Sequence, residues 1–243
     1  MAKGEDLRTL IRDYFRFEKQ EISFLVPAIL LTAFMFSFDN WGETELDVAL
    51  GMKNFFLASV IVAFSVLVRL SWQKINALGK GYKAEFKGWW VGLIIGLIIT
   101  FLSKGKITPV LMGSVVASFM VRHRLGSFRY GFSYFENALI SFWGVIANLI
   151  LSLIFAIALY FFPENTFFRE ALFFNWIMAL CAILPLPQLD GLNIYFGSRG
   201  LYYLAIVIVA IAGILLLTQT QLGLILAVLI AAISAVVLLL ANP

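Results

Sequence analysis

The residues with the clearest chemical potential end an apolar run at 183–191, ILPLPQLDG, where two prolines precede an acid and a glycine. The acid, Asp190, can bind a metal ion, transfer a proton or pair with a cation. Pro185 and Pro187 favour an extended backbone, because proline cannot continue the hydrogen bonds of a helix. We therefore expect an extended segment that presents Asp190 to neighbouring helices, with a helix cap at the membrane interface as the alternative.

Other groups that could catalyse a reaction are scarce. The chain has one histidine, His123, and one cysteine, Cys181, so two histidines and a carboxylate cannot bind zinc within one chain. The zinc motif HExxH is absent. We expect His123 near lipid headgroups and Cys181 as a buried, unreactive thiol. The four-residue spacing of Ser114 and Ser118 favours close helix packing over a serine nucleophile.

Composition indicates a membrane protein. The 243 residues are 62% hydrophobic and 13% charged, with a mean hydropathy of +0.95. Soluble domains have about 45–50% apolar and about 25% charged residues. Backbone inside a bilayer must be mostly helical, so we expect an all-α polytopic fold. The net charge of +4 fits cytoplasmic loops and lipid headgroups, and we expect the lipid bilayer, not nucleic acid, as a partner.

Apolar stretches long enough to cross a bilayer, about 20 residues each, occur repeatedly. They lie at about 22–38, 54–71, 89–103, 138–162, 170–186, 200–218 and 221–241. An eighth stretch at 107–121 is short and contains Pro109 and Gly113, which favour a re-entrant segment. We therefore expect about six to eight transmembrane helices.

Loop charges predict the orientation, because Lys and Arg concentrate on the cytoplasmic side. They are abundant in 1–21, 72–88 and 122–137, whereas 39–53 carries four acids and one lysine. This pattern predicts a multi-pass protein of the cell membrane with both termini and Asp190 on the cytoplasmic side. The expected units are an amphipathic N-terminal helix (1–21), a first transmembrane helix with an acidic external loop (22–53), a membrane core (54–195) and a C-terminal transmembrane hairpin (196–243).

Polar residues inside the apolar stretches are candidates for function, because burying them in a membrane is costly. Arg69 ends the second stretch, Asn148 lies in WGVIANLIL, and Asn175 lies in FFNWIMAL. For each asparagine the alternative is a hydrogen bond between helices, worth about 0.6 and at most about 2 kcal/mol.

Three stretches together resemble the site-2 protease family of intramembrane zinc proteases. ILPLPQLDG is similar to that family's motif asparagine-leucine-leucine-proline-x-proline-x-leucine-aspartate-glycine, and WGVIANLIL to its glycine-proline-x-x-asparagine, with the asparagine kept as Asn148. The stretch beginning RLSWQKINALGKGYKAEF resembles the surroundings of HExxH in archaeal-type members. The resemblance covers about 54–195 and implies a three-helix membrane core, a zinc cofactor and intramembrane proteolysis.

The resemblance fails at the positions of the zinc ligands. With Gly81 as the anchor, the first histidine falls on Arg69, the general-base glutamate on Leu70 and the second histidine on Gln73. Asp190 is then the only retained ligand, so we expect no zinc here. Arginine brings a permanent positive charge, and the family geometry therefore predicts a buried ion pair between Arg69 and Asp190.

A second register places the two histidines on Ser114 and Ser118, which also lack metal-binding groups. In both registers we expect a pseudoprotease without zinc-dependent peptidase activity. Such a protein would bind or regulate transmembrane segments of client proteins, and the groove candidates are Gln73, Asn148 and Asp190.

Two other functions remain open. One is an active intramembrane metalloprotease that uses ligands from a partner chain or an unrecognised set. The other is a small-solute transporter or channel, which few intramembrane charges and the lack of a paired inverted repeat disfavour.

Overall fold

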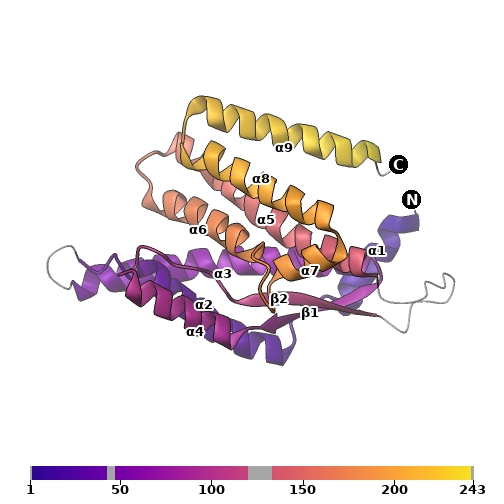
Figure 1. The fold of residues 1–243 in the computed structure, drawn as a ribbon, viewed down its shortest axis with the longest axis horizontal. Helices are drawn as coiled ribbons and strands as arrows, with labels where there is room; N and C mark the ends of the chain where they lie inside the picture. The colour runs from indigo at the N-terminus through magenta and orange to yellow at the C-terminus, as the bar shows by residue number, and fades with distance from the viewer. Residues whose placement is uncertain (1, 43–46, 120–132, 242–243) are drawn as a thin grey trace.

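The computed structural model describes residues 2–42, 47–119 and 133–241, and within them the chain forms nine helices and two strands (Figure 1). The elements in chain order are α1 (Ala2–Tyr14), α2 (Lys19–Ser37), α3 (Val48–Gly79), β1 (Tyr82–Gly88), α4 (Trp90–Leu102), β2 (Gly113–Phe119), α5 (Tyr134–Phe161), α6 (Thr166–Ala182), α7 (Asp190–Gly197), α8 (Arg199–Leu217) and α9 (Gln221–Ala241).

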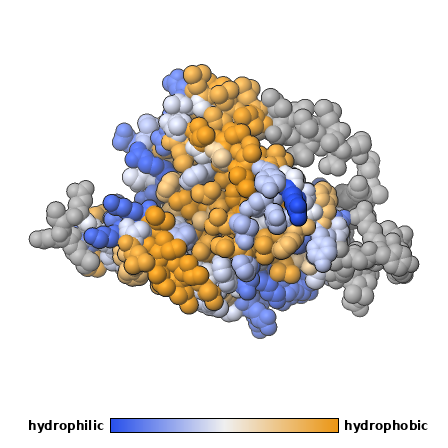
Figure 2. All heavy atoms as spheres, in the orientation of Figure 1, coloured by the Kyte–Doolittle hydropathy of each residue, from blue (hydrophilic) through white to orange (hydrophobic). Residues whose placement is uncertain are grey.

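Four of the described helices, α2, α3, α5 and α8, are long and apolar enough to cross a membrane. Apolar side chains dominate the face of the molecule drawn in Figure 2. The prediction of a helical membrane protein is confirmed. Helix α3 has 32 residues and is therefore about 48 Å long, more than the roughly 30 Å hydrocarbon core requires.

The N-terminal region is divided differently from the single helix expected over 1–21. Helix α1 ends at Tyr14, and α2 begins at Lys19. The break is stabilised by a capping box, in which Glu18 and Glu21 satisfy each other's backbone N–H groups. The apolar side of α1 lies against the end of α3, where Leu7 approaches Gly79. Helix α1 therefore packs on the chain itself.

The two strands correct the expectation for 72–88 and 107–121. Strands β1 and β2 pair in antiparallel register from Tyr82 with Phe119 to Gly88 with Gly113. Within 107–121, Gly113–Phe119 is therefore a strand, not a helix. Because Gly88 and Gly113 face each other, the excursion through α4 begins and ends at the same place. Helix α4, at 13 residues or about 20 Å, is too short to cross the membrane alone.

The core that carries the candidate site is built from α3, α5 and α6, with α7 packed on α5 (Figure 1). Trp72 lies beside Trp143, and Phe64 beside Phe155, with ring centroids 6.3 and 6.4 Å apart. Helices α3 and α5 are therefore antiparallel neighbours. In the view of Figure 1, α8 and α9 cover one side of this core, and the sheet, α2 and α4 lie on the other.

Candidate functional site

The centre of the candidate site is an ion pair between α3 and the first residue of α7. Arg69 Nη2 donates to Asp190 Oδ2 at 2.5 Å, and the two side chains are 6% and 0% exposed. The ion pair predicted from the sequence is present. A charge at such depth requires a partner, because an unpaired buried ion pays its full desolvation cost.

Gln73 reaches the same carboxylate oxygen from one helical turn further along α3. Its Nε2 donates to Asp190 Oδ2 at 3.0 Å and lies 3.4 Å from the Ser141 carbonyl oxygen. Arg69 and Gln73, at which the resemblance places the two histidines, both converge on Asp190. Leu70, at which the resemblance places the general base, is 2% exposed and offers only apolar surface.

The chain between α6 and α7 explains how Asp190 reaches this position. Residues 184–189 form no helix, and Leu189 has an extended backbone with φ −111° and ψ 157°. The extended segment expected from the prolines is interrupted by a turn, because Gln188 has a left-handed backbone with φ +61° and the Leu189 N–H donates to the Leu186 carbonyl oxygen at 3.2 Å. Asp190 also begins α7, where a negative charge is favourable near the helix N-terminus. Gly191 is required there, because a Cβ would overlap the carbonyl oxygens of Ile183 and Leu184.

Helix α5 closes the site from a third direction. A Cβ on Gly144 would overlap the Gln73 amide, so glycine permits the close approach of α5 to α3. Asn148 lies one turn further along α5 and is fully buried. Because α3 and α5 run antiparallel, Asn148 is level with Arg69.

Several buried polar atoms at this level have no hydrogen-bond partner among the described residues. They are Asp190 Oδ1, Gln73 Oε1 and both amide atoms of Asn148. Each such atom costs about 1–3 kcal/mol when it is left unsatisfied. These atoms are available to form hydrogen bonds with water or a ligand.

A small cavity lies beside the ion pair. The space open to the centre of a water-sized sphere is about 20 Å³. It is enclosed by α3, β1, α6 and the segments 110–113 and 183–189, and Arg69 is the charged side chain among the described lining residues. The lining consists of Val66, Arg69, Leu70, Phe86, Val110, Met112, Gly113, Met178, Ala182 and Leu189.

The remaining sequence candidates lie elsewhere. Asn175 Nδ2 donates to Ser65 Oγ at 2.9 Å, which is the expected hydrogen bond between helices. Cys181 is buried, as predicted. His123 lies outside the described residues.

The second register does not fit the structure. Ser114 and Ser118 lie on strand β2. A strand advances about 3.3 Å per residue, so these two side chains are about 13 Å apart along it. They cannot take the place of two ligands that are one helical turn apart.

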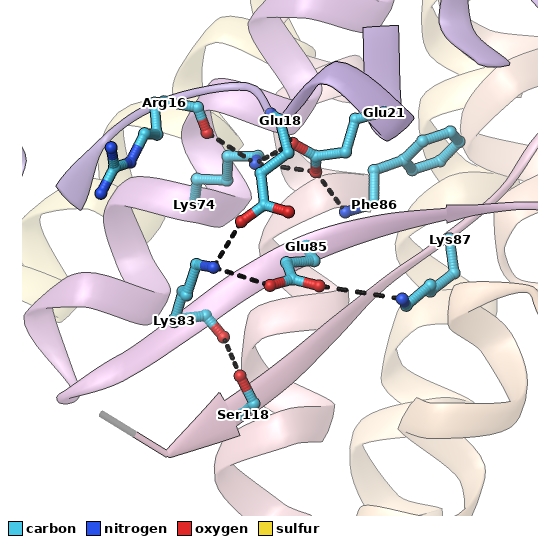
Figure 3. Close-up of polar contacts among 9 residues, drawn as sticks. All are labelled: Arg16, Glu18, Glu21, Lys74, Lys83, Glu85, Phe86, Lys87 and Ser118. Atoms are coloured by element: carbon cyan, nitrogen blue, oxygen red, sulfur yellow. Dashed lines mark hydrogen bonds and ion pairs between the residues drawn. The ribbon is translucent and has the colours of Figure 1, made fainter. Parts of the chain in front are cut away.

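Sequence analysis missed a second buried ion pair, which joins α2, α3 and β1 (Figure 3). Lys74 Nζ lies 2.8 Å from both carboxylate oxygens of Glu21. Glu21 also accepts the backbone N–H of Phe86 at 2.5 Å. Because Phe86 lines the cavity, this ion pair holds one wall of the site in place. The spacing of Glu18 and Glu21 before an apolar run was the available signal.

A more exposed network continues along β1 (Figure 3). Lys83 Nζ lies 2.5 Å from Glu18 and 2.8 Å from Glu85. These hydrogen bonds raise the pKa of Lys83, and the hydrogen bond from Lys83 lowers the pKa of Glu85. The network links the start of α2 to the outer face of the sheet.

The residues present do not fit zinc. Within the described ranges, no three His, Cys, Asp or Glu side chains cluster as metal ligands. A zinc site needs several neutral or anionic ligands around one ion. Here the one family ligand, Asp190, faces a guanidinium whose permanent charge repels a cation.

Comparison with known proteins gives one relative to report. The chain is 24% identical over 187 residues to the Methanocaldococcus jannaschii protein named "Putative zinc metalloprotease MJ0611", and the match covers 73% of this chain and 84% of the relative. No family model matches the chain. No solved structure matches it. The similarity supports a membrane protein related to zinc metalloproteases.

Proposed function

We propose that this chain is a site-2-protease-like pseudoprotease that binds transmembrane segments of client proteins. The observation that carries the proposal is the contact of Arg69 Nη2 with Asp190 Oδ2 at 2.5 Å. An ion pair stands where the resemblance places a metal ion and its ligands. On this proposal the chain keeps the membrane core that the resemblance implies and has replaced the groups that would make it a protease.

The loss of peptidase activity follows from the chemistry of hydrolysis. A zinc protease uses its metal to activate water and polarise the carbonyl, and a carboxylate to accept a proton. Leu70 cannot accept a proton. Asp190 Oδ2 already accepts hydrogen bonds from Arg69 and Gln73.

Client binding is supported by the unsatisfied polar atoms. Asp190 Oδ1 and Gln73 Oε1 can each accept a hydrogen bond that no described residue supplies, and the Asn148 amide can both donate and accept. An unwound membrane segment carries free N–H and C=O groups, which are costly in lipid without partners. The site and such a segment would satisfy each other.

We also propose the orientation that the loop charges predict, in the cell membrane with both termini cytoplasmic. The site then lies near the cytoplasmic surface, at the end of α3 that carries Arg69 and Gln73. A client would reach it from within the membrane or from that surface.

The proposal can be tested by crosslinking from the cavity wall. A photoreactive benzoylphenylalanine replaces Phe86 in the full chain, and a control chain carries it at Phe56, which is 68% exposed on the lipid-facing side of α3. The probes are synthetic apolar 20-residue peptides in vesicles, one with a central Asn-Pro-Gly and one uninterrupted.

We expect the interrupted peptide to crosslink at position 86 several times more than at position 56. The uninterrupted peptide should show no such preference. Equal yields at both positions, or for both peptides, would contradict client binding.

A further inference from the structure

The guanidinium of Arg69 has hydrogen-bonding capacity that the ion pair leaves unused. A guanidinium carries five N–H donors. In the described part of the chain, Arg69 donates to Asp190, and it also lines the cavity. The side chain is 6% exposed, so this capacity faces a nearly closed space and not the membrane surface.

The charge balance restricts what the cavity can accept. Arg69 and Asp190 together are neutral. A second anion would leave a net negative charge buried among apolar groups, which is costly. A cation would be repelled by the guanidinium. A neutral hydrogen-bond acceptor avoids both penalties.

The size and lining of the cavity restrict the ligand further. About 20 Å³ holds about one water-sized group, so the ligand must insert a single atom such as an oxygen. A buried water needs two to four polar partners, and the other side chains on the wall are apolar. A carbonyl oxygen needs only to accept a hydrogen bond from Arg69, and the rest of the ligand's chain can remain outside the cavity.

We propose that Arg69 binds a main-chain carbonyl oxygen of the client segment in this cavity. The inference rests on the proposed function and names the chemistry that the site recognises. The carbonyl must come from an unwound stretch, because a carbonyl inside a helix is already bonded to its own chain. Recognition is then of exposed backbone, and it tolerates different side chains.

The test follows one labelled carbonyl by infrared spectroscopy. The probe is the interrupted apolar peptide with ¹³C=¹⁸O placed at each residue of its central stretch in turn. The full chain is reconstituted in vesicles and compared with the double variant R69M/D190L. That variant removes both charges and leaves apolar groups, which buried ion pairs often tolerate.

The control variant is S65A/N175L. It removes a buried polar contact between α3 and α6 that does not line the cavity. Both variants alter α3 and a facing element, so general loosening of the core would affect them alike.

With the native chain, we expect one labelled carbonyl to shift to lower amide I frequency on binding. R69M/D190L should lose that shift and bind the peptide roughly ten- to hundredfold more weakly, as expected for a hydrogen bond to a charged donor. S65A/N175L should behave as the native chain. A thioamide at the shifted position should weaken binding to the native chain roughly tenfold, which tests the contact without any protein variant.

The outcomes separate the two proposals. If R69M/D190L binds as tightly as the native chain, or if no labelled carbonyl shifts while the peptide still binds, the Arg69 contact is overturned and client binding stands. If the native chain binds neither peptide, both proposals fall. If the uninterrupted peptide binds equally well, the requirement for unwound backbone is wrong.

Discussion

Arg69 Nη2 lies 2.5 Å from Asp190 Oδ2, although 121 residues separate the two in the chain. Gln73 donates to the same oxygen. One carboxylate therefore fastens the start of α7 to two successive turns of α3. This relationship determines both the chemistry and the stability of the candidate site.

Removing one partner of this ion pair should be costly. We expect R69A to lower the free energy of unfolding by about 3–5 kcal/mol, because it leaves the Asp190 charge buried and unpaired. R69A/D190A should cost clearly less than the sum of the single variants. Unfolding titrations in mixed detergent micelles measure these values, and additive losses would contradict a coupled ion pair.

The close approach of Gly144 to Gln73 should depend on the absence of a side chain at position 144. G144A places a methyl group against the Gln73 amide, and overpacking of this kind costs about 1–3 kcal/mol. Shortening the opposing side chain in G144A/Q73A should recover part of the loss. Gly200 is a matched control, since a Cβ there meets nothing closer than 3.9 Å, and G200A should change unfolding little.

The network on β1 predicts a pH dependence. The pKa of Glu85 is lowered in the folded chain, so its interaction with Lys83 contributes stability above the ordinary value of 4.5 and loses it as the pH falls through the folded pKa. The pKa of Lys83 is raised above 10.5, so its contribution is present below that pH and is lost as the pH rises through the folded pKa.

Thermal unfolding in detergent between pH 3 and pH 7 tests the acidic limb. K83M should flatten the fall in melting temperature below about pH 4.5. K106M removes an exposed lysine that shows no ion pair in the described ranges, and it should leave the native profile unchanged. Identical profiles for K83M and the native chain would rule out this contribution.

The convergence of two α3 side chains on Asp190 predicts that a metal site can be restored. We expect R69H/L70E/Q73H to bind zinc in about one-to-one ratio, because two imidazoles and a carboxylate form a zinc ligand set. Adding D190A should reduce zinc content sharply. Metal analysis of the purified chains measures this, and stoichiometric zinc in the native chain would contradict the pseudoprotease proposal.

Much of the candidate site followed from local patterns. The prolines before Asp190 predicted that the helix ends there, and they did not predict the turn at Gln188. The meeting of Arg69 and Gln73 with Asp190 was expected from resemblance to a known core and from loop charges that placed them on one side. Apolar run lengths determined the membrane class, because the bilayer imposes the same length on every crossing helix.

The strands show why local patterns were insufficient. Residues 82–88 alternate between apolar and charged side chains. The lysines of 72–88 nevertheless favour a cytoplasmic loop over a strand when the sequence is taken alone. Residues 107–121 are mostly apolar in their second half, and such a run does not distinguish strand from helix. Pairing between β1 and β2 decided the outcome, and pairing depends on two segments about 30 residues apart.

The sequence by itself determined that the chain is a helical membrane protein with one histidine, and with an aspartate at the end of an apolar run. Only the tertiary structure decided that Glu21 pairs with Lys74, that Gly144 admits the Gln73 amide, and that Arg69 faces a small apolar cavity. Helix periodicity and apolar length are properties of neighbouring residues. Burial, cavities and unsatisfied polar atoms arise where distant segments pack together. The free energy of that packing depends on residues from several segments at once, so no single segment predicts it.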